Sequence, residues 1–120
     1  MVARLSKRAL QQIVAGKVKE PVTAVVKFYN NNCHYCYALQ DGFKNVAAKY
    51  GEEGILFYAF NIQDYVEMER ILNFTGVPTI CLIKTGGLSP RIRVMPEPIA
   101  PNKNTWYEVP DIESFIEKEK

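Results

Sequence analysis

Continuous hydrophobic runs alternate along the chain with stretches in which apolar residues recur at helical spacing. Three runs are rich in β-branched and aromatic residues, which is typical of buried strands. These runs are 22–29 (VTAVVKFY), 55–62 (ILFYAFNI) and 79–84 (TICLIK). Residues 91–95 alternate, with Ile92 and Val94 on one side, and this predicts a strand with one buried face. A short first strand is expected at 2–5.

Helical spacing of apolar residues predicts four helices between and after these strands. The helix from about Cys33 to Tyr50 has the clearest pattern, because its apolar residues fall on one face. The residues expected to cap helices at the N-terminus are Ser6, Asp64 with Glu67 three residues later, and Asp111. The residues expected to end helices are Gly16, Gly51 and Gly76.

The resulting order of elements is β-α-β-α-β-α-β-β-α. Alternating strands and helices predict an α/β fold with a parallel sheet, and the turn at 85–87 adds a C-terminal antiparallel hairpin. Helices are expected on both faces of this mixed sheet. The chain of 120 residues suits one domain, 1–120. Five of the seven prolines fall between residues 90 and 110, so an irregular proline-rich segment is expected at 96–110.

Composition and charge exclude several classes of protein. The net charge of +2 comes from scattered basic residues, which gives no footprint for nucleic acid. No apolar run approaches the ~20 residues of a membrane span, and the N-terminal residues lack the apolar core of a secretory signal. Three cysteines are too few, and odd in number, for a disulfide-stapled scaffold. We therefore expect a cytoplasmic, monomeric protein in a reducing compartment.

The chemistry of the chain concentrates in the motif Cys33-His34-Tyr35-Cys36, between a predicted strand and a predicted helix. A helix N-terminus carries partial positive charge and free N–H groups, which stabilise a thiolate. The thiolate is the attacking species in disulfide exchange. Cys33 is expected to be the exposed nucleophile and Cys36 the resolving thiol. An imidazolium at His34 favours the Cys33 thiolate in one interpretation, and in the other His34 is a bystander on an exposed turn.

With this motif, the chain resembles the thioredoxin family over about residues 2–94 and the last helix. The second shared signature is Gly76-Val77-Pro78-Thr79, which resembles the family's cis-proline loop. The resemblance implies a thioredoxin fold, in which Gly76, Val77 and Pro78 align an extended substrate strand beside the dithiol. The spacing from Ile62 to Pro78 also matches the family, and Ile62 is assigned with them to the substrate-binding surface.

Three departures from the family matter. Asn32 stands where thioredoxins usually have a tryptophan, and His34 and Tyr35 stand between the cysteines, where proline or glycine is usual. Lys27 replaces a buried acid that is thought to assist proton transfer, and Ala59 replaces its partner lysine. Either the Lys27 ammonium reaches solvent and has no role, or it is a cation behind the dithiol that favours thiolates and tunes the redox potential.

Other interpretations of the same residues remain open. A zinc site would need two further ligands, so no metal is predicted. Cys81, in an apolar strand, is interpreted as a small core residue. Trp106 and Tyr107 lie in the proline-rich segment and either pack on the sheet edge or form a partner-binding loop.

The sequence predicts a dithiol–disulfide oxidoreductase that exchanges or reduces protein disulfides through Cys33 and Cys36. No cofactor is expected, since the chain has no flavin or dinucleotide motif, and an external reductase or thiol pool would recycle the dithiol. The alternative is a thioredoxin-fold binding module or accessory subunit whose redox chemistry is incidental. In that case, Cys33→Ser should leave the function intact, whereas changes at Trp106 should impair it. Glutaredoxin-like use of glutathione is a third hypothesis, suggested by Tyr35.

Overall fold

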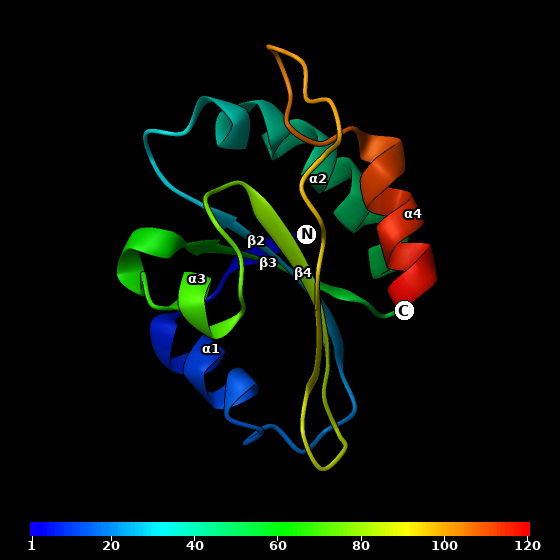
Figure 1. Cartoon of the computed structure of the whole chain (residues 1–120). Coiled ribbons are helices and arrows are strands. Elements are labelled where there is room, and N and C mark those ends of the chain that lie inside the picture. Colours follow the sequence, from blue (N-terminus) through cyan, green and yellow to red (C-terminus); the bar gives the residue numbers. More distant parts are fainter.

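A five-stranded mixed sheet forms the centre of the computed structural model, which describes residues 1–120 (Figure 1). The strands are β1 (Val2–Arg4), β2 (Thr23–Tyr29), β3 (Leu56–Asn61), β4 (Thr79–Lys84) and β5 (Arg91–Val94). Their order across the sheet is β1-β3-β2-β4-β5. β1, β3 and β2 are parallel, whereas β4 is antiparallel to β2 and β5 to β4. The expected parallel part and C-terminal antiparallel hairpin are therefore confirmed.

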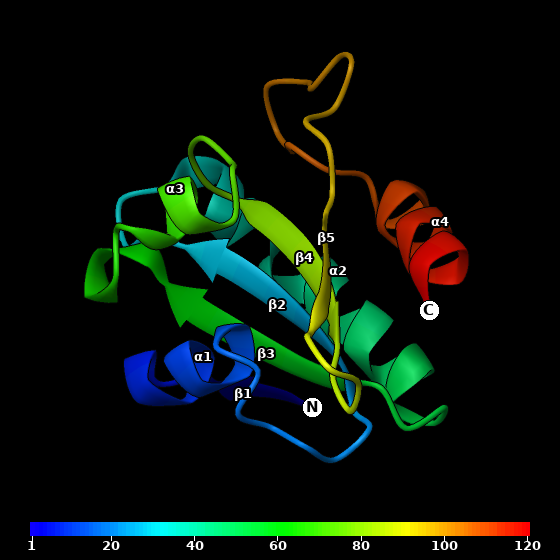
Figure 2. The same ribbon diagram turned by 60° about the horizontal axis from the view of Figure 1, so that its bottom comes forward.

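Helices cover both faces of the sheet, as the pattern of the sequence predicted (Figure 2). One face carries α1 (Lys7–Val14) and α3 (Met68–Ile71), and the other carries α2 (His34–Gly51) and α4 (Val109–Glu119). Alternation along β2 supplies both cores, because Val25 packs in the cluster under α2 and α4 and Val26 in the cluster under α1 and α3. Lys27 follows Val25 by two residues in β2, so its side chain lies on the same face of the sheet, under α2.

The helix ends agree with the sequence in part. Ser6 caps α1 as expected, since its side chain accepts a hydrogen bond from the Ala9 N–H at 3.1 Å. The predicted capping box at Asp64 is wrong. Asp64 is the last residue of a 3₁₀ turn, η1 (Ile62–Asp64), which the Asn61 side chain caps. α3 is then short and begins after Glu67 without a side-chain cap.

The prediction that Asp111 caps the last helix is also wrong, because α4 already begins at Val109 after Glu108. Pro110 fits there because the first turn of a helix needs no N–H from it.

The proline-rich segment leaves β5 and passes over the N-terminal end of α2 before α4 begins (Figure 1). Its path is fixed at its root by Met95, whose N–H donates to the Ile80 carbonyl at 2.8 Å. Tyr107 is buried and its hydroxyl lies 3.4 Å from the Met95 carbonyl oxygen. No helix of the chain has both the length and the apolar character that a membrane crossing requires. The fold thus places a long irregular segment next to the start of α2, where the dithiol lies.

Candidate active site

The dithiol lies at the junction between β2 and α2. Cys33 is the N-cap residue of α2, and its sulfur accepts a hydrogen bond from the Cys36 N–H at 3.0 Å. The two sulfurs form a disulfide, with the Cα atoms 5.1 Å apart. Cys33 is half-buried, whereas Cys36 is only 5% exposed. A substrate can therefore reach the Cys33 sulfur more readily than the Cys36 sulfur.

The local electrostatics favour a negative charge on the Cys33 sulfur once the disulfide is reduced. The first turn of α2 has no acidic residue, so the partial positive charge of the helix N-terminus is not offset there. The Cys36 N–H that now contacts the Cys33 sulfur is one of the free donors of that turn. These two features are what an attacking thiolate needs.

The segment before β4 lies next to the dithiol, at the end of the sheet where β2 ends and β4 begins. The peptide bond between Val77 and Pro78 is cis, and the Val77 carbonyl oxygen lies 3.6 Å from the Cys33 sulfur. Gly76, with a φ of +81°, adopts a backbone conformation that residues with a Cβ rarely take. Its N–H donates to a Glu69 carboxylate oxygen, and its carbonyl accepts from the Thr79 hydroxyl at 2.8 Å. These two hydrogen bonds of the Gly76 backbone thus fix the position of the neighbouring Val77 beside Cys33.

Lys27 lies in the wall of a cavity of about 380 Å³ that Cys33 and Cys36 also line. The residue is only 6% exposed, and its ammonium lies over the rings of Phe43, at 5.1 Å, and Tyr29, at 6.0 Å. Ala59 is its partner in the register with β3, so no acid stands opposite it. Burial, and then the charge of Lys44, lowers the pKa of Lys27 below its ordinary value. The side chain is therefore buried and lines the same cavity as the two cysteines.

The structure also gives the positions of His34, Ile62 and the third cysteine, Cys81. His34 is exposed on the first turn of α2, 5.6 Å from the ring of Tyr35. Ile62 was assigned to the substrate-binding surface, and this is wrong, because it is 6% exposed and packs in the core under α1 and α3. Cys81 is fully buried, as expected of a core residue, and burial raises the pKa of its thiol to about 12. Such a thiol takes no part in exchange near neutral pH.

Sequence reasoning missed five residues that line the cavity of the dithiol, namely Tyr29, Asn30, Asn31, Tyr37 and Gln40. Tyr37 is 79% exposed beside Cys36, and Gln40 stands four residues after Cys36 on α2. Residues four apart share a face of a helix, so the spacing could have indicated Gln40.

Tyr35, between the cysteines, connects the motif to the proline-rich segment. Its hydroxyl donates to the Asn102 carbonyl at 2.9 Å, and its ring centre lies 5.4 Å from that of Trp106. Trp106 and Tyr107 pack against the core under α2 and α4, as the packing interpretation of these aromatic residues expected. Nothing in the sequence pattern indicated that Tyr35 would be the point of contact.

A CxxC pair at a helix N-terminus, beside a cis-proline loop and on a mixed sheet, is the arrangement typical of thioredoxin-like folds. The family model of thioredoxin matches residues 1–97, so the chain belongs to the thioredoxin family. A comparison by sequence with curated proteins finds no significant match.

Solved structures of thioredoxins share the fold. Chloroplastic thioredoxin z is 17% identical with a TM-score of 0.65, and the match covers 98% of this chain and 92% of that one. The thioredoxin of Malassezia sympodialis is 13% identical with a TM-score of 0.66, covering 98% and 90%. A structure on thiol resolution in yeast mitochondrial 1-Cys peroxiredoxin by glutathione and thioredoxin systems is 14% identical with a TM-score of 0.67, covering 98% and 94%. At these identities the likeness concerns the fold alone.

Proposed function

We propose that this protein is a dithiol–disulfide oxidoreductase that acts on protein disulfides through Cys33 and Cys36. The observation that carries the proposal is the position of Cys33. Its half-buried sulfur caps α2, accepts the Cys36 N–H and lies 3.6 Å from the Val77 carbonyl. An extended substrate strand placed against Val77 would therefore bring its own disulfide to the attacking sulfur.

The exchange transfers two electrons from the dithiol to the substrate. The Cys33 thiolate attacks one sulfur of the substrate disulfide, forms a mixed disulfide and releases the other substrate sulfur as a thiolate, which takes a proton from water. Cys36 then loses its proton to solvent and attacks the Cys33 sulfur. This step forms the Cys33–Cys36 disulfide and frees the second substrate thiol. An external dithiol or reductase must supply two electrons for the next turnover.

The buried cation at Lys27 supports a potential above that of thioredoxin itself, which is about −270 mV. A cation near the dithiol stabilises the thiolate, and hence the reduced form, more than the disulfide. We therefore propose that the protein exchanges or isomerises disulfides as readily as it reduces them. The small number of cysteines supports a reducing, cytoplasmic setting in which the substrate disulfides are transient.

Trapping the mixed disulfide tests this function. Cys36→Ser should accumulate a covalent adduct with a disulfide-containing peptide, located at Cys33 by mass spectrometry, and Cys33→Ser should form none. Cys81→Ala is the matched control, since its thiol is buried and its loss should leave turnover in a dithiothreitol-coupled assay unchanged. If wild-type protein reduced the peptide no faster than dithiothreitol alone, the enzyme hypothesis would be wrong and a binding module would be the better explanation.

Glutaredoxin-like activity is separated in the same assay by replacing dithiothreitol with glutathione. Turnover that required glutathione and proceeded with Cys36→Ser would indicate a monothiol mechanism, in which Cys33 alone carries the chemistry. We expect turnover to require both cysteines, because the Cys36 sulfur is already placed to resolve an adduct at Cys33.

A further inference from the structure

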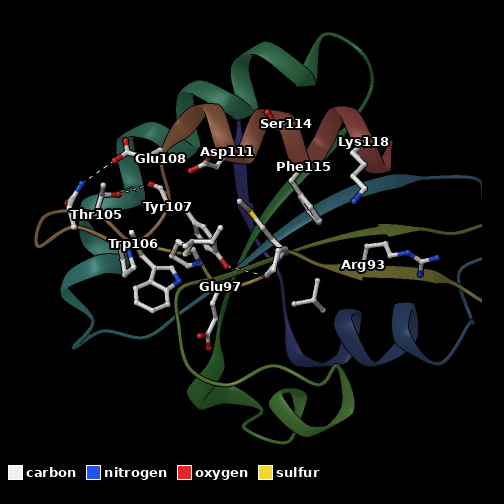
Figure 3. Close-up of a pocket in the computed structure, with 18 of the residues that line it drawn as sticks. Arg93, Glu97, Thr105, Trp106, Tyr107, Glu108, Asp111, Ser114, Phe115 and Lys118 are labelled. Atoms are coloured by element: carbon white, nitrogen blue, oxygen red, sulfur yellow. Dashed lines mark hydrogen bonds between the residues drawn. The ribbon is translucent and has the colours of Figure 1, made fainter.

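A cavity of about 630 Å³ lies between β5, the proline-rich segment and α4 (Figure 3). It is lined by aromatic and apolar side chains together with carboxylates. Arg93 and Lys118 lie at one end of the cavity, and Glu97 and Trp106 lie at the other (Figure 3). Glu119 also lines the cavity and pairs with Arg93, whereas no salt bridge involves Glu97. The proposed exchange reaction uses none of these residues.

The end of this cavity at Glu97 and Trp106 adjoins the dithiol. Tyr35 contacts both Asn102 and Trp106, which line the cavity, so one residue separates the cavity wall from Cys36. On its other side, Glu97 also lines a second hollow of about 180 Å³ that the segment Asn73–Thr75 and Thr79 border. Glu97 thus borders the segment that precedes Val77, and Trp106 contacts the dithiol motif through Tyr35.

Glu97 has no partner for its charge within the molecule. Its side chain is exposed and makes neither an ion pair nor a hydrogen bond, although Lys103 lies only six residues away. The carboxylate contributes, after burial, to raising the pKa of Tyr107 to about 12, which places negative potential at this end of the cavity. In Figure 3 the Glu97 carboxylate and the Trp106 indole both extend away from α4. A cavity lined by both an unpaired carboxylate and an aromatic ring suits a cation.

We propose that Glu97 and Trp106 form a subsite for an arginine or lysine side chain of the substrate protein, close in sequence to the disulfide that Cys33 attacks. The inference rests on the proposed function and names its substrate class. A basic side chain fits the subsite better than a neutral one for two reasons. The carboxylate supplies charge complementarity, and the indole supplies a face for the aliphatic stem and the cationic head. Arg93 and Lys118 lie at the other end of the cavity from Glu97 and form no salt bridge with it (Figure 3).

The size of the preference follows from these two contacts. An exposed ion pair and an exposed cation–π contact together change affinity by about fivefold. We therefore expect peptides with arginine at the best position to be reduced about fivefold more efficiently than their glutamine counterparts. Added salt should weaken the preference, because both contacts face solvent.

The experiment compares peptides that carry one intramolecular disulfide and a single arginine, glutamine or glutamate placed at each of the five positions on either side of the reacting cysteine. The ratio of kcat/KM for arginine over glutamine is measured within each protein variant, so a general change in reactivity cancels. Glu97→Gln should reduce the ratio to about one, and Glu97→Arg should favour the glutamate peptide. Glu52→Gln, an exposed carboxylate at the opposite end of α2, is the control that should keep the wild-type ratio.

Two further variants test the indole. Trp106→Leu should lower the ratio, and Trp106→Phe, which keeps an aromatic face, should retain most of it. A ratio near one in the wild-type protein at every peptide position would overturn the proposal. So would a ratio that Glu97→Gln leaves unchanged.

A binding measurement separates failure of the subsite from failure of the proposed function. Trp106 is the single tryptophan of the chain, so its fluorescence reports occupancy of this site directly. Peptides in which serine replaces both cysteines should bind wild-type protein with a Kd about fivefold lower for arginine than for glutamine. This difference, without any turnover, would support the subsite and overturn the oxidoreductase. Turnover without any difference in rate or binding would overturn the subsite and leave the oxidoreductase standing.

Discussion

Replacing Lys27 by methionine removes a buried charge from behind the dithiol and keeps a side chain of similar length. Lys27 lines the same cavity of about 380 Å³ as Cys33 and Cys36, and a sphere of that volume is about 9 Å across. Two unit charges at that separation interact by about 1.8 kcal/mol with an effective dielectric constant of about 20. For a two-electron couple this energy corresponds to about 40 mV. We expect Lys27→Met to lower the redox potential by about 20–40 mV, because the reduced form carries the thiolate only part of the time.

The assay equilibrates the wild-type protein and the variant in glutathione buffers of defined ratio and traps the free thiols. Lys17→Met is the control, since it makes the same change in net charge at an exposed position. The wild-type potential should lie above about −270 mV, the variant should move toward that value, and the control should match the wild type. If the potentials of the wild type and Lys27→Met agreed within about 10 mV, Lys27 would have no role at the dithiol and the electrostatic reasoning would be refuted.

Two further predictions concern stability and the proline-rich segment. Because burial lowers the pKa of Lys27, the folded state binds this proton less readily than the unfolded state does. The resulting loss of stability is complete below the folded pKa and vanishes as the pH rises to the ordinary value of 10.5. Lys27→Met should therefore unfold at higher denaturant concentration than wild type at pH 7, with a difference that shrinks toward pH 10.5. Tyr35→Phe loses one hydrogen bond to Asn102, worth about 0.5–1 kcal/mol. It should speed hydrogen exchange at the Asn104 and Thr105 amides by about two- to fivefold, and unchanged exchange would show that Tyr35 does not hold the segment.

The sequence predicted the sheet and the position of the dithiol because both depend on local patterns. The apolar run of β4 was predicted with the same bounds as observed, since continuous β-branched residues have few alternatives to a buried strand. Cys33 was expected at the start of α2 because its motif lies between an apolar strand and the periodic helical pattern that follows, and the structure makes it the N-cap of that helix. The sequence placed Lys27 in this apolar strand but left open whether its ammonium reaches solvent, and the structure shows the residue only 6% exposed.

The errors arose where tertiary contacts decide the structure. The Asp64 capping box resembled a helix start, yet the Asn61 side chain caps the turn before it. Ile62 was assigned by family spacing, but its side chain completes the core under α1 and α3. The contact between Tyr35 and Asn102 joins residues 67 positions apart, and no periodic pattern encodes such a pair.

The departures from the family gain a common interpretation from the structure. Asn32 removes the tryptophan that usually precedes the first cysteine, but the chain places its single tryptophan, Trp106, against the motif through Tyr35. Tyr35 in turn stands where thioredoxins usually have proline or glycine. A tryptophan thus contacts the motif from the proline-rich segment, through Tyr35, instead of from the residue before Cys33.

This arrangement separates the control of reactivity from the choice of substrate. In the two proposals, Lys27 acts on the dithiol from beneath α2 and Glu97 contacts the substrate from the proline-rich segment. The described cavities that Lys27 lines are not those that Glu97 lines. Sites without shared partners contribute additively. Lys27→Met should therefore change the redox potential and keep the arginine preference, and Glu97→Gln should do the reverse. The double variant should show both changes at full size, and a potential that moved in Glu97→Gln would show that the two devices are coupled through Tyr35.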